Sequence, residues 1–229
     1  MLGLIESFLQ AGVLEEMSGW QPSESGTPQG AVISPLLANL YLNPLDHVLA
    51  AAGSEMVRYA DDFVILCRTK AEAEAALAKV QAWVNEAGLT LHPEKTRLVD
   101  ATLPGGFEFL GYHFERGLRW PRQKNIQKLK ERLRPLTRRT SGQSLGVIVA
   151  QLNPILRGWF GYFRHSKAST FKGMDGWVRG RLRSILRKRR RGKGRGRGAD
   201  HQRWPNAYFA GHGLYTLWSA YRTACQSHG

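Results

Sequence analysis

The sequence predicts an α+β unit followed by an all-α bundle, on three observations. Two short apolar runs, Met56–Val57 and Phe63–Cys67, flank a turn-forming polar stretch, which is the pattern of a β-hairpin. Farther on, apolar residues recur at helical spacing from Ile126 to Leu186. Charge divides the same way, because residues 1–100 carry 6 Lys and Arg against 13 Asp and Glu, whereas residues 101–229 carry 27 against 5.

Helices surround the hairpin in the first unit. We expect a helix over Met1–Leu14 and a largely apolar helix over Ile33–Leu49, which begins at a Ser-Pro pair because Ser caps helices and Pro fits the first turn. Thr69 opens a third helix with Glu72 as its capping-box partner, and Gly88 ends it. The buried stripe of that helix is predicted to be Ala73, Ala76, Leu77, Val80 and Val84.

Short strands and then helices follow. The candidate strands are Leu98–Val99, Phe107–Phe109 and Tyr112–Phe114. The candidate helices of the bundle are Ile126–Leu136, Leu145–Leu156 and Phe171–Arg190, and Pro154 predicts a kink in the second. Glycines and repelling charges in residues 192–198 cannot bury a core, so we expect a mobile basic tether there and a small separate unit over residues 199–229.

Composition limits the classes of partner and compartment. The net charge of +22 in residues 101–229 predicts a polyanion partner, most simply RNA or DNA. Cys67 and Cys225 form no spaced framework, which favours a reducing compartment. No run of 18 apolar residues and no basic start before an apolar stretch occurs, so we expect neither a membrane span nor a signal peptide.

The acidic pair in the hairpin is the main catalytic candidate. Asp61 and Asp62 stand side by side, and holding two like charges together is costly unless a cation shares them. Carboxylate oxygens suit Mg²⁺, and Mg²⁺ beside a basic nucleic-acid channel suggests two-metal nucleotidyl transfer. Adjacent residues on a strand point to opposite sides, so Asp61 is predicted to be the better ligand. The alternative is that the pair is ordinary solvated turn chemistry.

The acidic pair belongs to a series of motifs along the chain. In order, these motifs are Gly26–Gly30, Tyr59–Asp62, Gly88–Thr96, Phe109–Tyr112 and Gly158–Arg164. In this order and spacing, nearly the whole chain resembles the group II intron-encoded reverse transcriptases, also called maturases. The resemblance implies a partial polymerase palm with an antiparallel sheet over residues 1–120, an all-α thumb or maturase bundle over 121–191, the tether over 192–198 and an RNA-binding unit over 199–229.

The resemblance also implies roles for the loop and the hairpin. Residues of the loop would contact template and nucleotide, namely Gly26, Pro28, Gln29 and Gly30, although a surface turn is the alternative. Tyr59 would line the primer end and Ala60 would leave room for it, whereas the alternative for Tyr59 is a plain strand aromatic. Asp61 would bind Mg²⁺ directly, with Asp62 supporting the site.

Two other positions receive roles in the same way. Lys95 would lie near the triphosphate and would stabilise or protonate departing pyrophosphate, and the alternative is a surface lysine. Gly111 would let the primer backbone come close, and the alternative is a strand with a bulge.

Cations and aromatic residues of the basic half are candidate RNA contacts. The aromatic candidates are Trp159, Tyr162 and Phe163, of which we expect two to be helix core and the other to stack on RNA. Arg157 and Arg164 stand beside them and would clamp the RNA. The next cations are predicted phosphate contacts rather than a plain solvated face: Arg181, Arg183, Arg187, Lys188 and Arg189.

The resemblance implies an RNA-directed DNA polymerase that binds intron RNA and a DNA primer or target, and acts in a ribonucleoprotein of the bacterial cytoplasm. The alternative is a non-catalytic maturase fragment that binds intron RNA and assists splicing. The family uses a further Asp on a strand before the Gly26–Gly30 loop, and here that strand and the fingers would have to precede Met1. We therefore expect little polymerisation by this chain alone, whether it is half of a split enzyme with a second chain, a truncation or a remnant.

Overall fold

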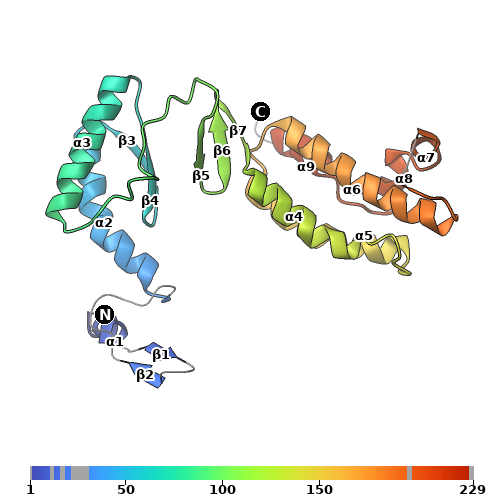
Figure 1. The fold of residues 1–229 in the computed structure, drawn as a ribbon, viewed down its shortest axis with the longest axis horizontal. Coiled ribbons are helices and arrows are strands. Elements are labelled where there is room, and N and C mark those ends of the chain that lie inside the picture. Colours follow the sequence, from blue (N-terminus) through green and yellow to red (C-terminus); the bar gives the residue numbers. More distant parts are fainter. Residues whose placement is uncertain (1, 11–12, 16–18, 22–30, 195–197, 227–229) are drawn as a thin grey trace. The chain divides into compact units, whose positions relative to one another are not determined.

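The computed structural model describes residues 2–10, 13–15, 19–21, 31–194 and 198–226. The chain divides into two compact units, Met1–Leu98 and Val99–Gly229, which are drawn from blue to green and from green to red in Figure 1. No helix within the described ranges is long and apolar enough to cross a membrane.

The described elements of the first unit are four strands and three helices. In chain order they are α1 (Leu2–Gln10), β1 (Val13–Glu15), β2 (Gly19–Gln21), α2 (Ser34–Ala51), β3 (Glu55–Tyr59), β4 (Asp62–Leu66) and α3 (Lys70–Glu86). Strands β1 and β2 pair with each other, and β3 and β4 form the predicted antiparallel hairpin. The first helix ends at Gln10, short of the predicted Leu14, because Val13–Glu15 enters a strand ladder instead.

Helices α2 and α3 pack against one face of the β3–β4 hairpin. Their buried residues make a small core: Leu45, Leu49, Val80 and Val84. Met56, Phe63 and Ile65 from the hairpin pack on it, and the register places Met56 opposite Ile65. The other face of the hairpin is turned away from this core, and Val57 and Leu66 are exposed there.

Helix α3 begins where the sequence predicts. The Thr69 hydroxyl accepts a hydrogen bond from the backbone N–H of Glu72 at 3.2 Å. The Glu72 carboxylate accepts from the N–H of Arg68 at 2.8 Å, so the reciprocal bond reaches one residue farther back than a simple capping box. Gly88 has a φ of +68°, a left-handed conformation that suits glycine after a helix.

The second unit is a three-stranded sheet followed by six helices among its described residues. These are β5 (Phe107–Phe109), β6 (Tyr112–Glu115), β7 (Leu118–Pro121), α4 (Gln123–Leu136), α5 (Leu145–Phe163), α6 (Ala168–Arg189), α7 (Gly198–Arg203), α8 (Asn206–Gly211) and α9 (Leu217–Gln226). The sheet has the antiparallel order β5-β6-β7, and β7 was not expected. Leu98–Val99 forms no strand, and α5 continues through Pro154 to Phe163.

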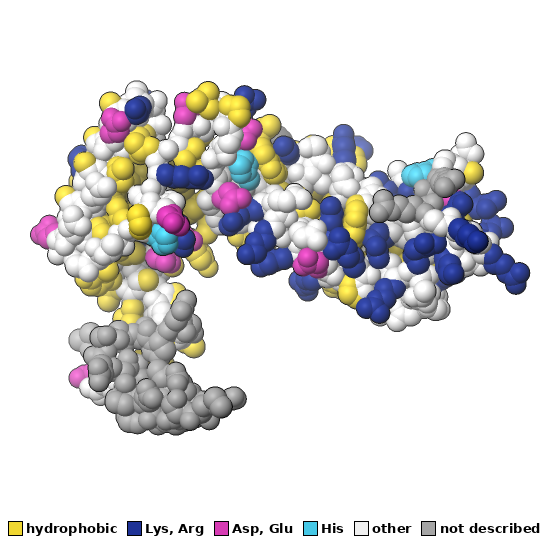
Figure 2. Space-filling view, viewed as in Figure 1, with side chains coloured by type: hydrophobic (Ala, Val, Ile, Leu, Met, Phe, Trp, Pro, Cys, Tyr) yellow, Lys and Arg dark blue, Asp and Glu magenta, His cyan; other side chains and the backbone are white. Residues whose placement is uncertain are grey.

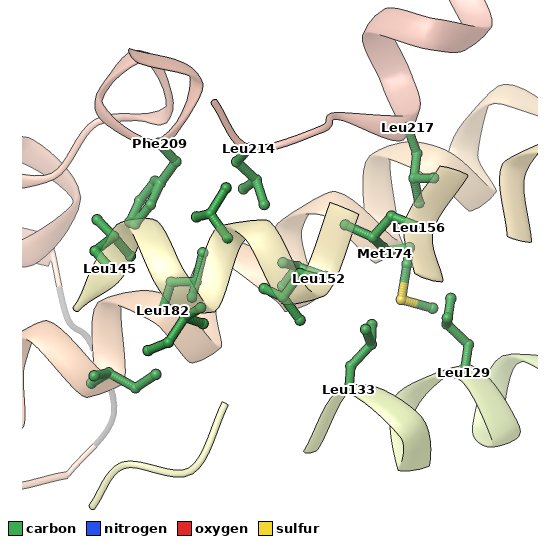
Figure 3. Close-up of a cluster of buried hydrophobic side chains, with 14 of the residues drawn as sticks. Leu129, Leu133, Leu145, Leu152, Leu156, Met174, Leu182, Phe209, Leu214 and Leu217 are labelled. Atoms are coloured by element: carbon green, nitrogen blue, oxygen red, sulfur yellow. The ribbon is translucent and has the colours of Figure 1, made fainter. Parts of the chain in front are cut away.

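One hydrophobic core is shared by the helices of this unit. Leu129 and Leu133 of α4 face Met174 of α6 and Leu156 of α5 in Figure 3. Buried residues of the last segment join the same core: Trp204, Phe209, Leu214 and Leu217. The structure therefore differs from the prediction of a separate unit over residues 199–229, because those residues bury their apolar side chains against α4–α6.

The β5–β7 sheet is bonded to the helices of its own unit. Tyr112 donates its hydroxyl to the backbone oxygen of Tyr162 at 2.6 Å, and Tyr162 donates to that of Leu110 at 2.8 Å. The N–H of Lys167 donates to the carbonyl of Arg119 at 2.8 Å. The boundary between the two compact units falls after Leu98, whereas the sequence predicts that the palm ends at residue 120.

Helix α9 is tied to α6 through one buried carboxylate. Asp175 accepts hydrogen bonds from the first two backbone N–H groups of α9, those of Leu217 and Trp218, both at 3.0 Å. Burial raises the pKa of Asp175, and the two N–H donors act in the opposite direction. This carboxylate satisfies two helix-end donors that otherwise have no partner within the helix.

We predict that Asp175→Ala destabilises the chain by about 1–3 kcal/mol, because one buried and one partly buried N–H group lose their acceptor. Asp175→Asn keeps one carbonyl oxygen as an acceptor and should lose less. Urea unfolding followed by near-ultraviolet circular dichroism measures both variants. Equal stability of Asp175→Ala and the unsubstituted chain would show that this carboxylate does not hold α9.

Candidate functional site

The acidic pair lies at the tip of the β3–β4 hairpin. Tyr59 pairs with Asp62, so Ala60 and Asp61 form the connection between the strands. Ala60 has a φ of +53°, a left-handed conformation that such a short connection demands. Tyr59 is 67% exposed and both carboxylates are exposed, so the tip is open to a large ligand.

Arg58 fixes this tip to helix α2. Its guanidinium donates from Nε to the Asp46 carboxylate at 2.8 Å, and a second nitrogen contacts the other oxygen of that carboxylate. A third nitrogen donates to Asn39 Oδ1 and to the carbonyl oxygen of Ala60, both at 2.9 Å. The Arg58 side chain is only 10% exposed, so one planar group joins the helix to the turn that carries Asp61.

The ion pair changes the titration of its members. The hydrogen bond from Arg58 lowers the pKa of Asp46, and the same bond raises the pKa of Arg58. A carboxyl with a lowered folded-state pKa stabilises the fold above its unfolded pKa, and the contribution is lost as the pH falls through the lowered value. The anchor of the hairpin is therefore intact at neutral pH.

Asp61 and Asp62 differ from Asp46 in their side-chain partners. Within the described part of the chain, neither of their side chains makes a hydrogen bond or an ion pair. The described residues also contain no group of three or more His, Cys, Asp or Glu suited to a metal ion. Mg²⁺ commonly takes one or two protein carboxylates and completes its shell with water and substrate phosphates. Two exposed, unpaired carboxylates fit that donor set.

The other predicted residues of the first unit stand apart from this tip or outside the described residues. Lys95 is exposed in the turn that follows His92, to whose carbonyl oxygen its backbone N–H donates at 3.2 Å. Its side chain has no contact with the acidic pair in the described structure, so its role stays a prediction. The loop residues Gly26, Pro28, Gln29 and Gly30 lie outside the described residues.

Lys and Arg side chains gather over the helices of the second unit, as the dark blue atoms in Figure 2 show. Several predicted phosphate contacts among them are turned inward. Arg183 is 3% exposed, and it donates to the carbonyl of Trp204 and to Asn206, both at 2.9 Å. Its guanidinium also lies over the ring of Phe209. Arg183 is therefore a core residue here, because its burial leaves no surface for a phosphate.

Arg181 and Arg187 are likewise committed to the protein. Arg181 donates to Thr137 Oγ1 at 2.7 Å and to the Thr137 carbonyl at 2.8 Å. The second bond gives a partner to a carbonyl oxygen at the C-terminal end of α4. Arg187 donates to Asp200 at 2.6 Å and to the carbonyl of Lys193 at 2.8 Å. Both are half-buried, and their donors serve the fold rather than open solvent.

The remaining predicted cations are exposed. The Lys188 side chain has no partner in the described ranges, and Arg189 reaches the carbonyl oxygens of the α4–α5 loop. Arg157 lies 5.4 Å from the ring centre of Tyr215, and Arg164 donates to His165 at 3.2 Å. These four side chains keep at least part of the guanidinium or ammonium group in solvent.

The aromatic motif of α5 divides as the sequence predicts. Phe163 is buried and Trp159 is half-buried against the core, whereas Tyr162 is 56% exposed. Two of the three therefore pack inside, and Tyr162 is the one available at the surface. Its hydroxyl is nevertheless used, because it donates to Leu110 in the β5–β6 turn.

Gly111 serves the β5–β6 turn in the first place. Its φ is +81°, and a Cβ there would lie 2.7 Å from the side-chain nitrogen of Asn125. Its carbonyl oxygen accepts from Asn125 at 2.9 Å and from the N–H of Arg122 at 3.0 Å. Local backbone geometry is thus sufficient to explain why a glycine stands at this position. Contact with the primer stays a prediction.

Sequence reasoning missed Arg58 and Asp46, although both are visible in the printed chain. Arg58 stands one residue before Tyr59, and Asn39 and Asp46 are seven residues apart, which places them on one face of a helix. That spacing was the available signal. Only the folded hairpin reveals that one guanidinium reaches both.

Comparison with known proteins matches two family profiles to consecutive parts of the chain. A profile of the family described as reverse transcriptase (RNA-dependent DNA polymerase) matches residues 1–114, and a profile of the group II intron maturase-specific domain matches residues 126–204.

Three relatives illustrate the similarity. The group II intron-encoded protein LtrA of Lactococcus lactis subsp. cremoris is 56% identical over 48 residues, which are 20% of this chain and 8% of LtrA. An uncharacterized 91 kDa protein in a cob intron of Schizosaccharomyces pombe is 24% identical, over 43% of this chain and 19% of its own length. The Pol polyprotein from the type-1 retrotransposable element R2 of Nasonia vitripennis is 29% identical, over 42% and 10%.

The matched stretches thus cover less than a fifth of each of these relatives. The first profile matches the part of the chain that contains the hairpin, and the second matches the part that contains the α5 motif. Together the two profiles span most of the chain. The chain therefore belongs to the group II intron-encoded reverse transcriptases, or maturases.

Proposed function

We propose that this protein takes part in RNA-directed DNA synthesis and in binding the RNA of a group II intron. The observation that carries the proposal is the hairpin tip, where Asp61 and Asp62 are exposed and have no partner among the described residues, and where Arg58 bonds the adjacent Ala60 carbonyl. Membership of the family supports the reaction class, transfer of a deoxynucleotide to a primer 3′-hydroxyl.

Residues of the hairpin would bind the metal ion and orient the primer end. Asp61 and Asp62 supply carboxylate oxygens, and Tyr59 pairs with Asp62 on the face of the hairpin that is turned away from the core. Bound Mg²⁺ would neutralise phosphate charge and activate the attacking hydroxyl. Arg58 keeps the turn in place while charge changes around it, because its donors are saturated by Asp46, Asn39 and Ala60.

The second unit would hold the nucleic acid. It carries the basic excess, and Arg157, Arg164, Lys188 and Arg189 retain exposed positive charge. The maturase-specific match over residues 126–204 supports intron RNA as the polyanion, with a DNA primer or target as the second nucleic acid. We place its action in a ribonucleoprotein of the bacterial cytoplasm, by analogy with the Lactococcus relative.

Assistance in splicing is the second candidate function. It would need the basic helices and not the carboxylates. The observation that favours it is that the helices have a hydrophobic core of their own, so their cations are positioned without the hairpin. Loss of Asp61 should spare splicing assistance and remove DNA synthesis, which separates the two activities.

We predict that Mn²⁺, added as a paramagnetic stand-in for Mg²⁺, broadens the backbone amide signals of Tyr59–Asp62 before others. Asp61→Asn should weaken this effect about 10-fold or more, because it removes one of the two carboxylates. Glu55→Gln removes the same charge at the far end of the hairpin and serves as the control. Broadening that spares the tip, or that survives in Asp61→Asn, would contradict the metal assignment.

We also predict that exposed cations set the salt dependence of RNA binding. The triple variant Arg157→Gln, Arg164→Gln, Lys188→Gln should reduce the slope of log K against log salt by roughly 2, since about 0.7 counterions are released per phosphate contact on a single strand.

The matched control neutralises Lys70, Lys79 and Arg97, three exposed cations of the acidic first unit. That variant should leave the slope unchanged. Filter binding across a salt series gives both slopes, and equal slopes in the two triple variants would argue against phosphate contact by the helices.

A further inference from the structure

A groove lies within the second unit between α4, α5 and the β5–β6 turn. Its volume is about 550 Å³, which is within the range of roughly 300–1,000 Å³ typical of small-ligand pockets. Leu129, Ile155 and Trp159 give it an apolar lining, and Lys128 and Arg132 lie at its α4 side. The metal chemistry proposed for the hairpin makes no use of this groove.

Its walls are held in fixed positions. The Trp159 ring packs against Phe163 at 5.0 Å and edge-on to Phe171 at 6.4 Å between ring centres. On the other side, Tyr162 donates to the Leu110 carbonyl, and Tyr112 donates back to the Tyr162 carbonyl. These reciprocal bonds lock the β5–β6 turn to α5, so the groove is preformed and does not depend on a flexible loop.

The two cations at the groove have no partner among the described residues. Lys128 and Arg132 are one helical turn apart on the same face of α4, about 5–6 Å between their Cβ atoms. Both are exposed, and within the described ranges neither side chain has an ion pair or a hydrogen bond. Glu131, the acid that lies between them in sequence, is bonded instead to Gln127 at 3.1 Å.

One glycine keeps the groove open. Gly158 lines it, and a Cβ on Gly158 would meet no atom within 4 Å. Glycine in the middle of a helix costs about 1 kcal/mol relative to alanine, and no positive φ or close backbone approach requires it here. The absence of a side chain instead leaves open space at this wall of the groove.

We propose that the groove holds one unpaired nucleotide of a bound RNA strand. The base would lie against the apolar wall of Ile155 and Trp159 at Gly158, and the flanking phosphates would meet Lys128 and Arg132. The charge complementarity of two free cations at an apolar slot selects a nucleotide over an apolar peptide. The inference rests on the proposed RNA-binding function and adds recognition of an unpaired base to it.

The test compares two RNA hairpins that differ by one bulged 2-aminopurine nucleotide. Binding is followed by fluorescence anisotropy and by quenching of the 2-aminopurine when it stacks. We expect the unsubstituted chain to bind the bulged hairpin about 5- to 150-fold more tightly, the range given by stacking of one base on an aromatic side chain.

Two substitutions on α5 make a matched pair. Gly158→Leu fills the groove and should abolish the preference for the bulge and the quenching, with affinity for the paired hairpin within 2-fold. Gly161→Leu adds the same side chain at an exposed position of the same helix that does not line the groove, and should keep both. Both substitutions raise helix propensity, so neither should unfold the unit.

Each remaining outcome is decisive. Equal binding of the two hairpins by the unsubstituted chain, or a preference that survives in Gly158→Leu, would overturn the groove assignment and leave RNA binding standing. A loss of thermal stability in Gly158→Leu without any change in RNA preference would show that the bulged base does not bind in the groove, which also overturns the assignment. Failure of the unsubstituted chain to bind either hairpin would instead overturn the proposed RNA-binding function.

Discussion

The bidentate ion pair between Arg58 and Asp46 is the interaction on which the candidate catalytic hairpin depends. Two adjacent carboxylates repel each other, and a short connection whose Ala60 is left-handed is an unfavourable place for a residue with a Cβ. Arg58 offsets the second cost, because the guanidinium that binds Asp46 also donates to the Ala60 carbonyl. The acids can therefore stay exposed and unpaired while the backbone beneath them is fixed.

Basic side chains have two different roles in this chain, and the two groups differ in burial. Arg58, Arg181, Arg183 and Arg187 direct their donors at carbonyl and carboxylate oxygens and hold elements together. Lys128, Arg132 and Lys188 remain exposed with no partner among the described residues. A high count of basic residues thus overstates the number of phosphate contacts, because part of the charge is structural.

Local signals predicted the elements well and the tertiary partners poorly. Alternation, capping and helical spacing located the β3–β4 hairpin, the start of α3 at Thr69 and the apolar faces of α4–α6. Strand β7 was not predicted because its four residues show little alternation of apolar and polar side chains. The packing of residues 199–229 was not predicted because shared burial depends on residues that are far apart in the sequence. For the same reason, Arg183 reads as one of a run of cations, although it lies in the core. At the site, Asp61 and Asp62 follow from the motif, whereas Arg58, its anchor, follows only from the fold.

The central claim is that the hairpin tip gathers the divalent metal at the end of a growing strand. Fe²⁺ in place of Mg²⁺, with ascorbate and peroxide, cuts polypeptide and nucleic acid near the metal. With a primer annealed to an RNA template, the account predicts protein cleavage centred on Tyr59–Asp62 and cleavage of the primer close to its 3′ end, both lost in Asp61→Asn. Protein cleavage away from the hairpin, or a primer cut only far from its 3′ end, would contradict it.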